Sequence, residues 1–198
     1  EPTIQKDGPM IIIAGAGSGK TRVLTYRIAY LMSQGIDPFN ILALTFTNKA
    51  AREMKDRIAT IVGASEAKNL WMGTFHSVFS KILRIECDRI GYTRDFTIYD
   101  TQDSKNLIRS IVREMNLDDK LYKANIVYSR ISSAKNNLLS ATAYMKNAEL
   151  MSDDNMNHRP KLGEIYFEYQ KRCFKSNAMD FDDLLFKTNV LLKDHPEI

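Results

Sequence analysis

The sequence predicts an α/β fold in which a parallel sheet carries helices on its faces and a long all-helical segment interrupts the sheet. Three observations support this prediction. Short apolar runs alternate with amphipathic helical patterns over the first hundred residues, which is typical of βαβ units. A glycine-rich turn follows the first apolar run directly. After Tyr99 the strand signal fades and helical patterns dominate.

Four apolar runs are the expected strands, at residues 10–14, 41–45, 70–74 and 96–99. Helices with apolar stripes lie between them. We expect these helices to end at Gly35, Gly63 and Gly91, because glycine readily adopts the left-handed conformation that closes a helix. The third of them is expected to span about residues 76–90.

The next helix is expected to begin at Asp100 or Thr101, since either side chain can cap it. The predicted organisation is therefore an α/β domain over residues 1–100, an all-helical subdomain over 101–178, and a return of the chain to the first domain over 179–198. The return consists of a helix over about residues 181–192.

The composition limits the possible classes of protein. Twenty-eight basic and 24 acidic residues give a net charge of +4, which permits a polyanionic partner without requiring one. No apolar run approaches the roughly 20 residues of a membrane span, and no signal peptide is recognisable, so we expect a cytoplasmic chain without membrane contact. The two cysteines, Cys87 and Cys173, show no metal-ligand spacing and are expected to be buried or half-buried free thiols.

The glycine-rich turn reads Ala-Gly-Ala-Gly-Ser-Gly-Lys-Thr and is expected to bind the phosphates of a nucleoside triphosphate. Glycines let backbone N–H groups surround an anion, and the following helix directs its positive end at the same place. Lys20 is expected to contact the β and γ phosphates and Thr21 to bind Mg²⁺, which makes these two residues the catalytic candidates. A turn without a ligand is the alternative. The predicted cradle consists of Ala14, Gly15, Ala16, Gly17, Ser18, Gly19, Lys20 and Thr21.

Two strand ends carry an aromatic residue followed by hydrogen-bonding side chains. Phe46 precedes Thr47, Asn48 and Lys49, and the segment from Gly73 to Ser77 repeats the arrangement. Ligands bind where parallel strands end, and an aromatic ring there can stack on a base. Alternatively, the phenylalanines are ordinary core residues and the polar residues are helix caps.

Together these motifs closely resemble the N-terminal part of a superfamily 1 DNA helicase of the UvrD/Rep/PcrA type. The matching segments are GAGSGKTRVL at residues 15–24, TFTNKAAREM at 45–54, GTFHS at 73–77, ISSAKN at 131–136 and MDFDDL at 179–184. The resemblance covers nearly the whole chain. It implies a RecA-like P-loop NTPase domain with a parallel sheet and an inserted helical subdomain.

The resemblance also implies roles for individual residues. ATP and Mg²⁺ would be the cofactors, with Arg22 near the base. Phe46, Thr74 and His76 would line a track for single-stranded DNA. Lys135 and Asn136 could add a contact to DNA from the helical subdomain, although a solvated helix surface is an equal alternative. The partners would be single-stranded DNA, junctions of single- and double-stranded DNA, and the remaining helicase domains.

Hydrolysis needs further groups that the sequence does not supply clearly. Asp180, Asp182 and Asp183 are candidates for the carboxylate that binds Mg²⁺, but their sequence context is more typical of the start of a helix. We expect the acidic Mg²⁺-binding strand, the arginines and a second RecA-like domain to lie beyond residue 198, and these residues alone to be catalytically inactive. The intact protein would couple ATP hydrolysis to 3′–5′ translocation on single-stranded DNA and to unwinding.

Three alternatives remain open. The first is the motor subunit of a helicase-nuclease, which would use the same core. The second is a P-loop kinase for a small molecule, although Arg109, Arg113 and Arg130 are too dispersed to form an arginine-rich lid. The third is a nucleotide-gated DNA-binding module without catalysis.

Overall fold

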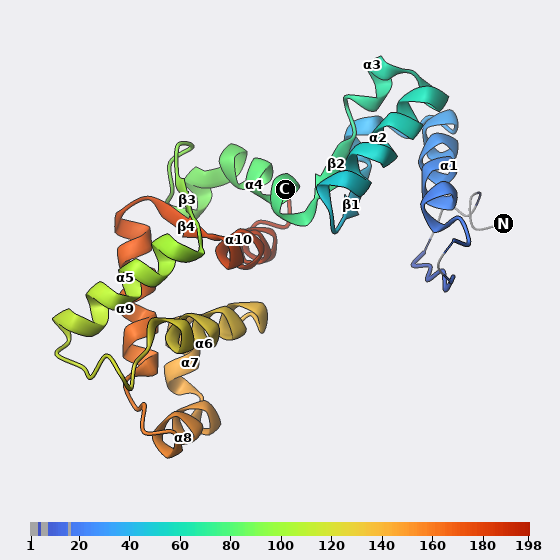
Figure 1. Cartoon of the computed structure of the whole chain (residues 1–198). Coiled ribbons are helices and arrows are strands. Elements are labelled where there is room, and N and C mark those ends of the chain that lie inside the picture. Colours follow the sequence, from blue (N-terminus) through green and yellow to red (C-terminus); the bar gives the residue numbers. More distant parts are fainter. Residues whose placement is uncertain (1–3, 5–7, 16) are drawn as a thin grey trace. The chain divides into compact units, whose positions relative to one another are not determined.

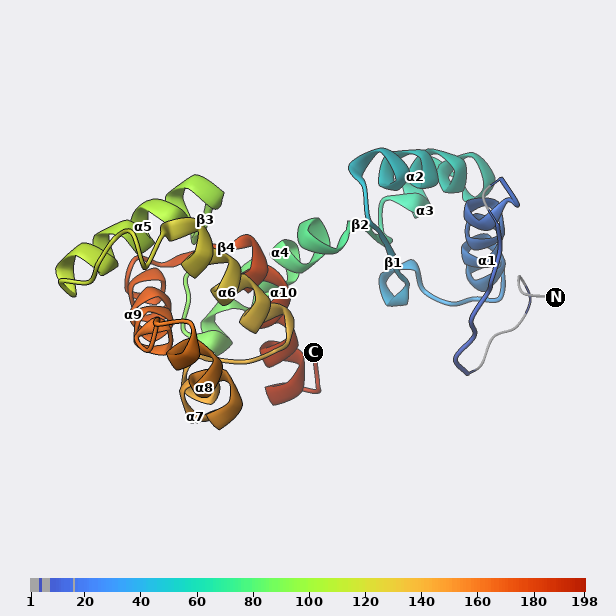
Figure 2. The same ribbon diagram turned by 60° about the horizontal axis from the view of Figure 1, so that its bottom comes forward.

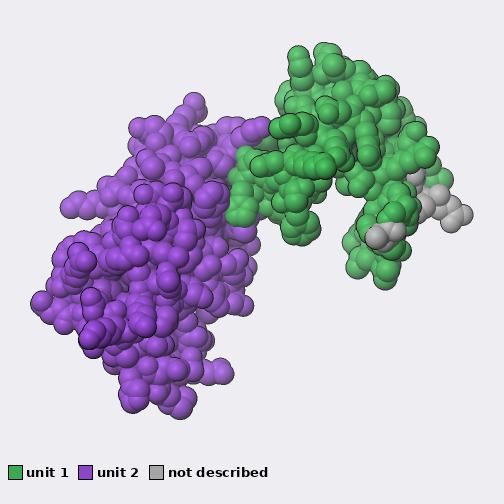
Figure 3. Space-filling view, viewed as in Figure 1, with its two compact units in different colours: residues 1–78 green, residues 79–198 purple. Residues whose placement is uncertain are grey.

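The computed structural model describes the chain apart from residues 1–3, 5–7 and 16 (Figure 1). The chain divides into two compact units, Glu1–Val78 and Phe79–Ile198 (Figure 3). Helices dominate both units, and the described strands form two parallel pairs. The fold is α/β with parallel pairing, as the sequence predicts. The finer division at residues 100 and 178 stays a prediction.

The first unit places helices beside one short parallel pair of strands. Leu42 pairs with Trp71 and Thr45 with Thr74, so the two strands end side by side. Helix α2 packs against α1 and β2. The elements are α1 (Lys20–Ser33), the 3₁₀ helix η1 (Pro38–Asn40), β1 (Leu42–Thr45), α2 (Asn48–Val62), α3 (Ala64–Ala67) and β2 (Trp71–Thr74).

The core of the first unit joins these elements through buried apolar side chains. Met54 and Ile58 of α2 are fully buried and share one cluster with Ile28 of α1 and Ala43 of β1. Glycine ends both helices, as predicted: Gly35 and Gly63 have φ of 82° and 97°. The apolar stripes of the sequence therefore identify the buried faces correctly.

The strand expected at residues 10–14 is wrong. These residues have no strand conformation, and Ile11 and Ile13 are 89% and 96% exposed. An apolar run forms a buried strand only where a neighbouring strand pairs with it. In the described part of the chain, β1 and β2 pair with each other alone.

Helix α4 (Phe75–Glu86) follows β2 directly and continues into the 3₁₀ helix η2 (Cys87–Ile90), which ends at Gly91. The predicted helix over residues 76–90 is therefore confirmed, with a tighter last turn. The remaining elements are β3 (Thr97–Tyr99), α5 (Thr101–Glu114), α6 (Ala124–Asn136), α7 (Ala141–Lys146), α8 (Ala148–Met156), α9 (Leu162–Lys175), β4 (Ala178–Asp180) and α10 (Phe181–Asp194).

The second unit is built on the parallel pair of β3 and β4. Thr97 pairs with Ala178 and Tyr99 with Asp180, so the helical segment leaves from one strand and returns in the other. Asp100 caps α5 with a reciprocal capping box, as predicted. Helix α5 packs against α6 and α9, and α7 packs against α9 (Figure 2).

Two apolar clusters fill the second unit. The larger one joins α5, α6 and α9 through side chains such as Ile108, Val127 and Tyr169. The smaller one surrounds Met179 of β4 and includes Phe96. Cys87 and Cys173 are buried free thiols, as predicted, and burial raises the pKa of Cys173 to about 12. None of the described helices is long and apolar enough to cross a membrane.

Candidate functional site

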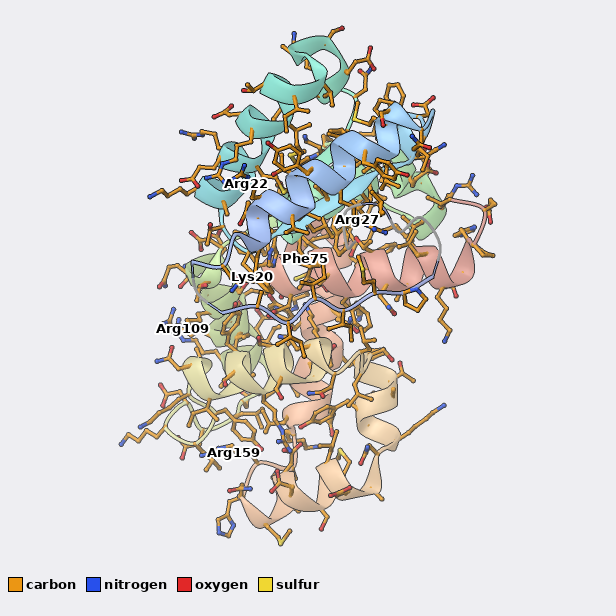
Figure 4. All side chains as sticks on the ribbon, turned by 90° about the vertical axis from the view of Figure 1, so that its right-hand side faces the viewer. Lys20, Arg22, Arg27, Phe75, Arg109 and Arg159 are labelled. Atoms are coloured by element: carbon orange, nitrogen blue, oxygen red, sulfur yellow. The ribbon has the colours of Figure 1, made fainter. Side chains whose placement is uncertain are left out.

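The glycine-rich loop leads into the first turn of α1, where Lys20 lies (Figure 4). Gly17 and Gly19 have φ of 76° and 85°, a conformation that residues with a side chain rarely adopt. The Lys20 ammonium donates to the carbonyl oxygens of Ala14 and Gly15 at 2.8 and 3.0 Å. The lysine therefore lies over its own loop.

This loop has the donor set that a phosphate needs. No side chain of the described residues caps the N-terminus of α1, so its first backbone N–H groups can bind an anion. Lys20 is exposed, and its partners among the described residues are carbonyl groups, which a phosphate oxygen can replace. Ser18 donates to Gly15 O at 2.7 Å and closes the turn. Ala16 lies outside the described residues.

The expected Mg²⁺ ligand, Thr21, is exposed at the start of α1. Its carbonyl accepts a hydrogen bond from the Thr25 hydroxyl at 2.8 Å, within α1. The described residues include no group of three His, Cys, Asp or Glu side chains that could hold a metal ion. The expected binding of Mg²⁺ by Thr21 stays a prediction.

Arg22 follows on the same helix, beside an open hollow of about 460 Å³. Its guanidinium lies 5.6 Å from the centre of the Tyr26 ring. Arg57 of α2 also lines the hollow. The expected proximity of Arg22 to a nucleotide base stays a prediction.

Phe46 and Phe75 lie at the ends of the two paired strands. Because Thr45 pairs with Thr74, the residues that follow come together, and their ring centres are 5.7 Å apart with planes tilted by 44°. Phe46 is 92% exposed, which rules out the alternative that it is a core residue. An exposed, partly supported ring is suited to stacking on a base.

Polar residues surround this aromatic pair. Thr47 caps α2, since its hydroxyl accepts the Ala50 N–H at 3.1 Å, and Asn48 and Lys49 are exposed in the first turn of the helix. The cap and a DNA contact are compatible, because the cap uses one lone pair of the hydroxyl. Thr74 and His76 are half-buried beside Phe75.

The whole chain, residues 1–198, matches the family model described as UvrD/REP helicase N-terminal domain. The chain belongs to this family. The protein named ATP-dependent DNA helicase PcrA from Bacillus subtilis (strain 168) is 47% identical to it over 193 residues, covering 97% of this chain and 25% of that protein. Those from Staphylococcus aureus (strain Mu50) and Staphylococcus epidermidis are 44% and 45% identical. Their coverage is 97% and 96% of this chain, and 26% and 25% of those proteins.

This UvrD/REP helicase N-terminal domain thus spans about a quarter of the length of the curated relatives it matches. The resemblance to a UvrD/Rep/PcrA-type N-terminal region is confirmed over the full chain.

The structure corrects the expectation for Lys135. In this UvrD/REP domain Lys135 is 1% exposed, so it has no free surface for DNA. Its ammonium lies 2.7 Å from Asp180 Oδ2 and 2.9 Å from Asp183 Oδ1. Asn136, in contrast, is exposed, and its amide donates to Asp182 Oδ1 at 3.1 Å.

The three aspartates begin α10, as the sequence indicates. Asp180 is the N-cap residue and forms a reciprocal capping box with Asp183. The Tyr169 hydroxyl donates to Asp180 Oδ2 at 2.8 Å. These carboxylates are occupied within the fold, and this argues against a metal-binding role.

Burial and charge act in opposite directions on this cluster. Burial opposes ionisation of Asp180, but the Lys135 ammonium outweighs it and holds the pKa of Asp180 below its usual value. For Asp183 burial dominates and raises the pKa. Burial also disfavours the charged form of Lys135, yet the two carboxylates raise its pKa overall.

Sequence reasoning missed the role of Gly73. A Cβ at this position would lie 2.5 Å from Ser77 Oγ and 3.1 Å from Val78 Cγ2. The Ser77 hydroxyl needs this space, because it accepts the Thr74 N–H and donates to Thr74 O, both at 3.0 Å. A glycine immediately before a Thr-x-x-Ser cap is the signal that could have identified this packing.

Proposed function

We propose that this chain is the N-terminal, ATP-binding part of an ATP-dependent DNA helicase that couples ATP hydrolysis to movement along single-stranded DNA in the 3′–5′ direction and to unwinding. The observation that carries the proposal is the aromatic pair Phe46 and Phe75. Parallel pairing brings the two rings to the strand ends, and Phe46 is almost fully exposed. A ring in this position stacks on any base, as a motor that ignores sequence requires.

The proposed nucleotide site lies at the start of α1. Lys20 would exchange its two carbonyl acceptors for phosphate oxygens, and the uncapped helix end would add backbone N–H donors. Thr21 would bind Mg²⁺, which supplies charge neutralisation at the phosphates when it is present. Arg22 would lie near the base.

The proposed DNA track lies beside the aromatic pair. Asn48 and Lys49 are exposed where α2 begins, and Thr47, Thr74 and His76 complete the polar surroundings. Donors of this kind bind phosphate and sugar without reading sequence. We further assign residues 1–100 to a RecA-like domain, 101–178 to its helical insertion and 179–198 to the returning segment.

The described residues do not include the full set of groups for hydrolysis. No described metal-binding cluster is present, and Asp180 and Asp183 are engaged by Lys135. We therefore expect the isolated 198 residues to bind nucleotide and DNA weakly, without efficient turnover. Junctions of single- and double-stranded DNA and the remaining helicase domains are the proposed partners.

The test is ATP hydrolysis by the full-length gene product with and without single-stranded DNA, with Lys20→Ala as the blank. Strong stimulation by DNA that Lys20→Ala abolishes is the expected result. Hydrolysis that is indifferent to DNA would overturn the proposal and favour another P-loop enzyme, such as a small-molecule kinase.

A further inference from the structure

A basic hollow of about 380 Å³ lies in the second unit, where α5 faces the start of α6. Arg109 and Arg113 are four residues apart on α5, so they share one face of the helix. Lys123 approaches from the residue that precedes α6. The lining consists of Arg109, Val112, Arg113, Asp119, Tyr122, Lys123, Ala124 and Asn125.

The three cations of this hollow outnumber Asp119, the carboxylate residue of its lining, and form no ion pair among the described residues. No described carboxylate lies within ion-pair distance of any of them, although Asp119 is part of the lining. One N–H group of Arg109 donates to Asn106 Oδ1 at 2.6 Å, and the other N–H groups of this guanidinium can donate to a ligand. Elsewhere in the unit, the arginines that form ion pairs include Arg89, Arg130 and Arg172.

The start of α6 adds donors of the right kind. This helix has 13 residues, and in the described part of the chain no side chain caps its N-terminus. The described structure gives the N–H groups of Ala124 and Asn125, which both line the hollow, no acceptor. The positive end of the helix therefore adds to the field of the three cations.

Packing fixes the segment that carries Lys123. Tyr122 is 4% exposed, and its hydroxyl accepts the Lys161 N–H at 3.2 Å. The Arg159 guanidinium donates to Leu121 O at 3.0 Å. A binding site whose backbone is already held loses little entropy when a ligand arrives.

We propose that this hollow binds one phosphate group. Two arginine forks, an ammonium and free backbone N–H groups match the several oxygens of a tetrahedral anion. The phosphate could belong to the backbone of duplex DNA or be a free anion. The DNA source rests on the proposed function, whereas the anion site itself does not. The site replaces buried Lys135 as the candidate contact between the helical segment and a polyanion.

The test uses the 198-residue chain labelled with ¹⁵N, titrated separately with a short DNA duplex and with inorganic phosphate at constant ionic strength. The Ala124 and Asn125 amide signals report on the site. Arg109→Ala/Arg113→Ala is the test variant. Lys146→Ala/Lys175→Ala removes the same charge at exposed positions outside the hollow and is the matched control.

We expect at least one probe to shift both amide signals, and the test variant to weaken that binding by about tenfold while the control changes it less than about twofold. Shifts with duplex alone identify a backbone phosphate, and in the test variant the slope of log affinity against log salt then falls by about 1, as expected for the loss of one phosphate contact. Shifts with inorganic phosphate identify a free anion as a sufficient ligand.

The proposal is overturned if neither probe moves these signals, or if the test and control variants weaken binding equally, because net charge alone would then explain the effect. Failure here leaves the DNA-stimulated hydrolysis of the full-length protein untouched. The two proposals can therefore fail separately.

Discussion

The Lys135 ammonium and Asp180 carboxylate form an ion pair of 2.7 Å in which the two side chains are 0% and 2% exposed. The pair joins α6 to Asp180, the N-cap residue of α10. Asp183 Oδ1 lies 2.9 Å from the same ammonium. That second contact is electrostatic, because Asp183 Oδ1 accepts no hydrogen bond in the described structure. A motif residue that the sequence offered as a DNA contact therefore links α6 to the start of α10.

Lys135→Met should strongly destabilise the second unit, because it leaves two buried carboxylates without their counter-charge. Loss of one partner of a buried pair typically costs about 3–5 kcal/mol. Urea unfolding followed by circular dichroism measures the change. Lys146→Met, at an exposed position, is the control and should change stability little. A cost below about 1 kcal/mol for Lys135→Met would show that the network is dispensable.

Phe46→Ala should weaken binding of single-stranded DNA by about 5- to 150-fold, the loss of one stacked base, without lowering stability. The ring is 92% exposed, so its removal leaves no cavity. Phe39→Ala is the matched control, since Phe39 is 59% exposed but lies in η1, before β1. Fluorescence anisotropy with a labelled oligonucleotide gives the affinities. Equal losses for both variants would contradict a stacking role.

Gly73→Ala should destabilise the first unit by about 1 kcal/mol, the usual cost of a lost helix cap. The new Cβ would force the Ser77 hydroxyl away from Thr74. The same substitution in a Ser77→Ala background should cost less, because that cap is already absent. Thermal unfolding of the four proteins checks this coupling. If the two substitutions lower stability additively, Ser77 is not the residue that a Cβ at position 73 displaces.

Glu114→Gln should remove part of the acid sensitivity of the second unit. Hydrogen bonds from Arg172 and then Ser110 lower the pKa of Glu114 from 4.5 to about 2. A carboxyl with a lowered pKa contributes stability that is present above pH 4.5 and is lost as the pH falls through about 2. The contribution is small, because the Glu114 side chain is 55% exposed.

Urea midpoints for wild type and Glu114→Gln, measured from pH 7 to pH 2, check this dependence. The two curves should differ near neutral pH and converge at the acid end. Glu149→Gln, whose carboxylate forms no ion pair in the described chain, should follow wild type throughout. Curves that stay parallel down to pH 2 would contradict the assignment.

Local sequence signals predicted most of the helices but not all of the strands. Gly35, Gly63 and the Asp100 cap mark real helix boundaries, because capping depends on neighbouring residues alone. Strand β4 was missed, since three residues are too few to show an alternating pattern. The strand at residues 10–14 was expected wrongly, because an apolar run does not reveal whether a neighbour pairs with it.

At the candidate site, too, the sequence predicts some contacts and not others. The meeting of Phe46 and Phe75 follows from parallel strands of equal register, which the sequence order suggests. The burial of Lys135 does not follow from the sequence order, because its partner Asp180 is 45 residues away along the chain. Only the fold brings a lysine and two aspartates of separate motifs together. The basic hollow beside α5 likewise depends on packing between helices.

The parallel pair of β3 and β4 has a consequence for how this domain can be altered. The segment between them, residues 100–177, departs at Tyr99 and comes back at Ala178, which pairs with Thr97 only two residues earlier. Its ends are therefore separated by about the length of one short strand, roughly 10 Å. The corresponding segment of a relative could therefore be inserted between these strands, provided that it carries a lysine and a tyrosine where Lys135 and Tyr169 meet Asp180, which lies outside the segment.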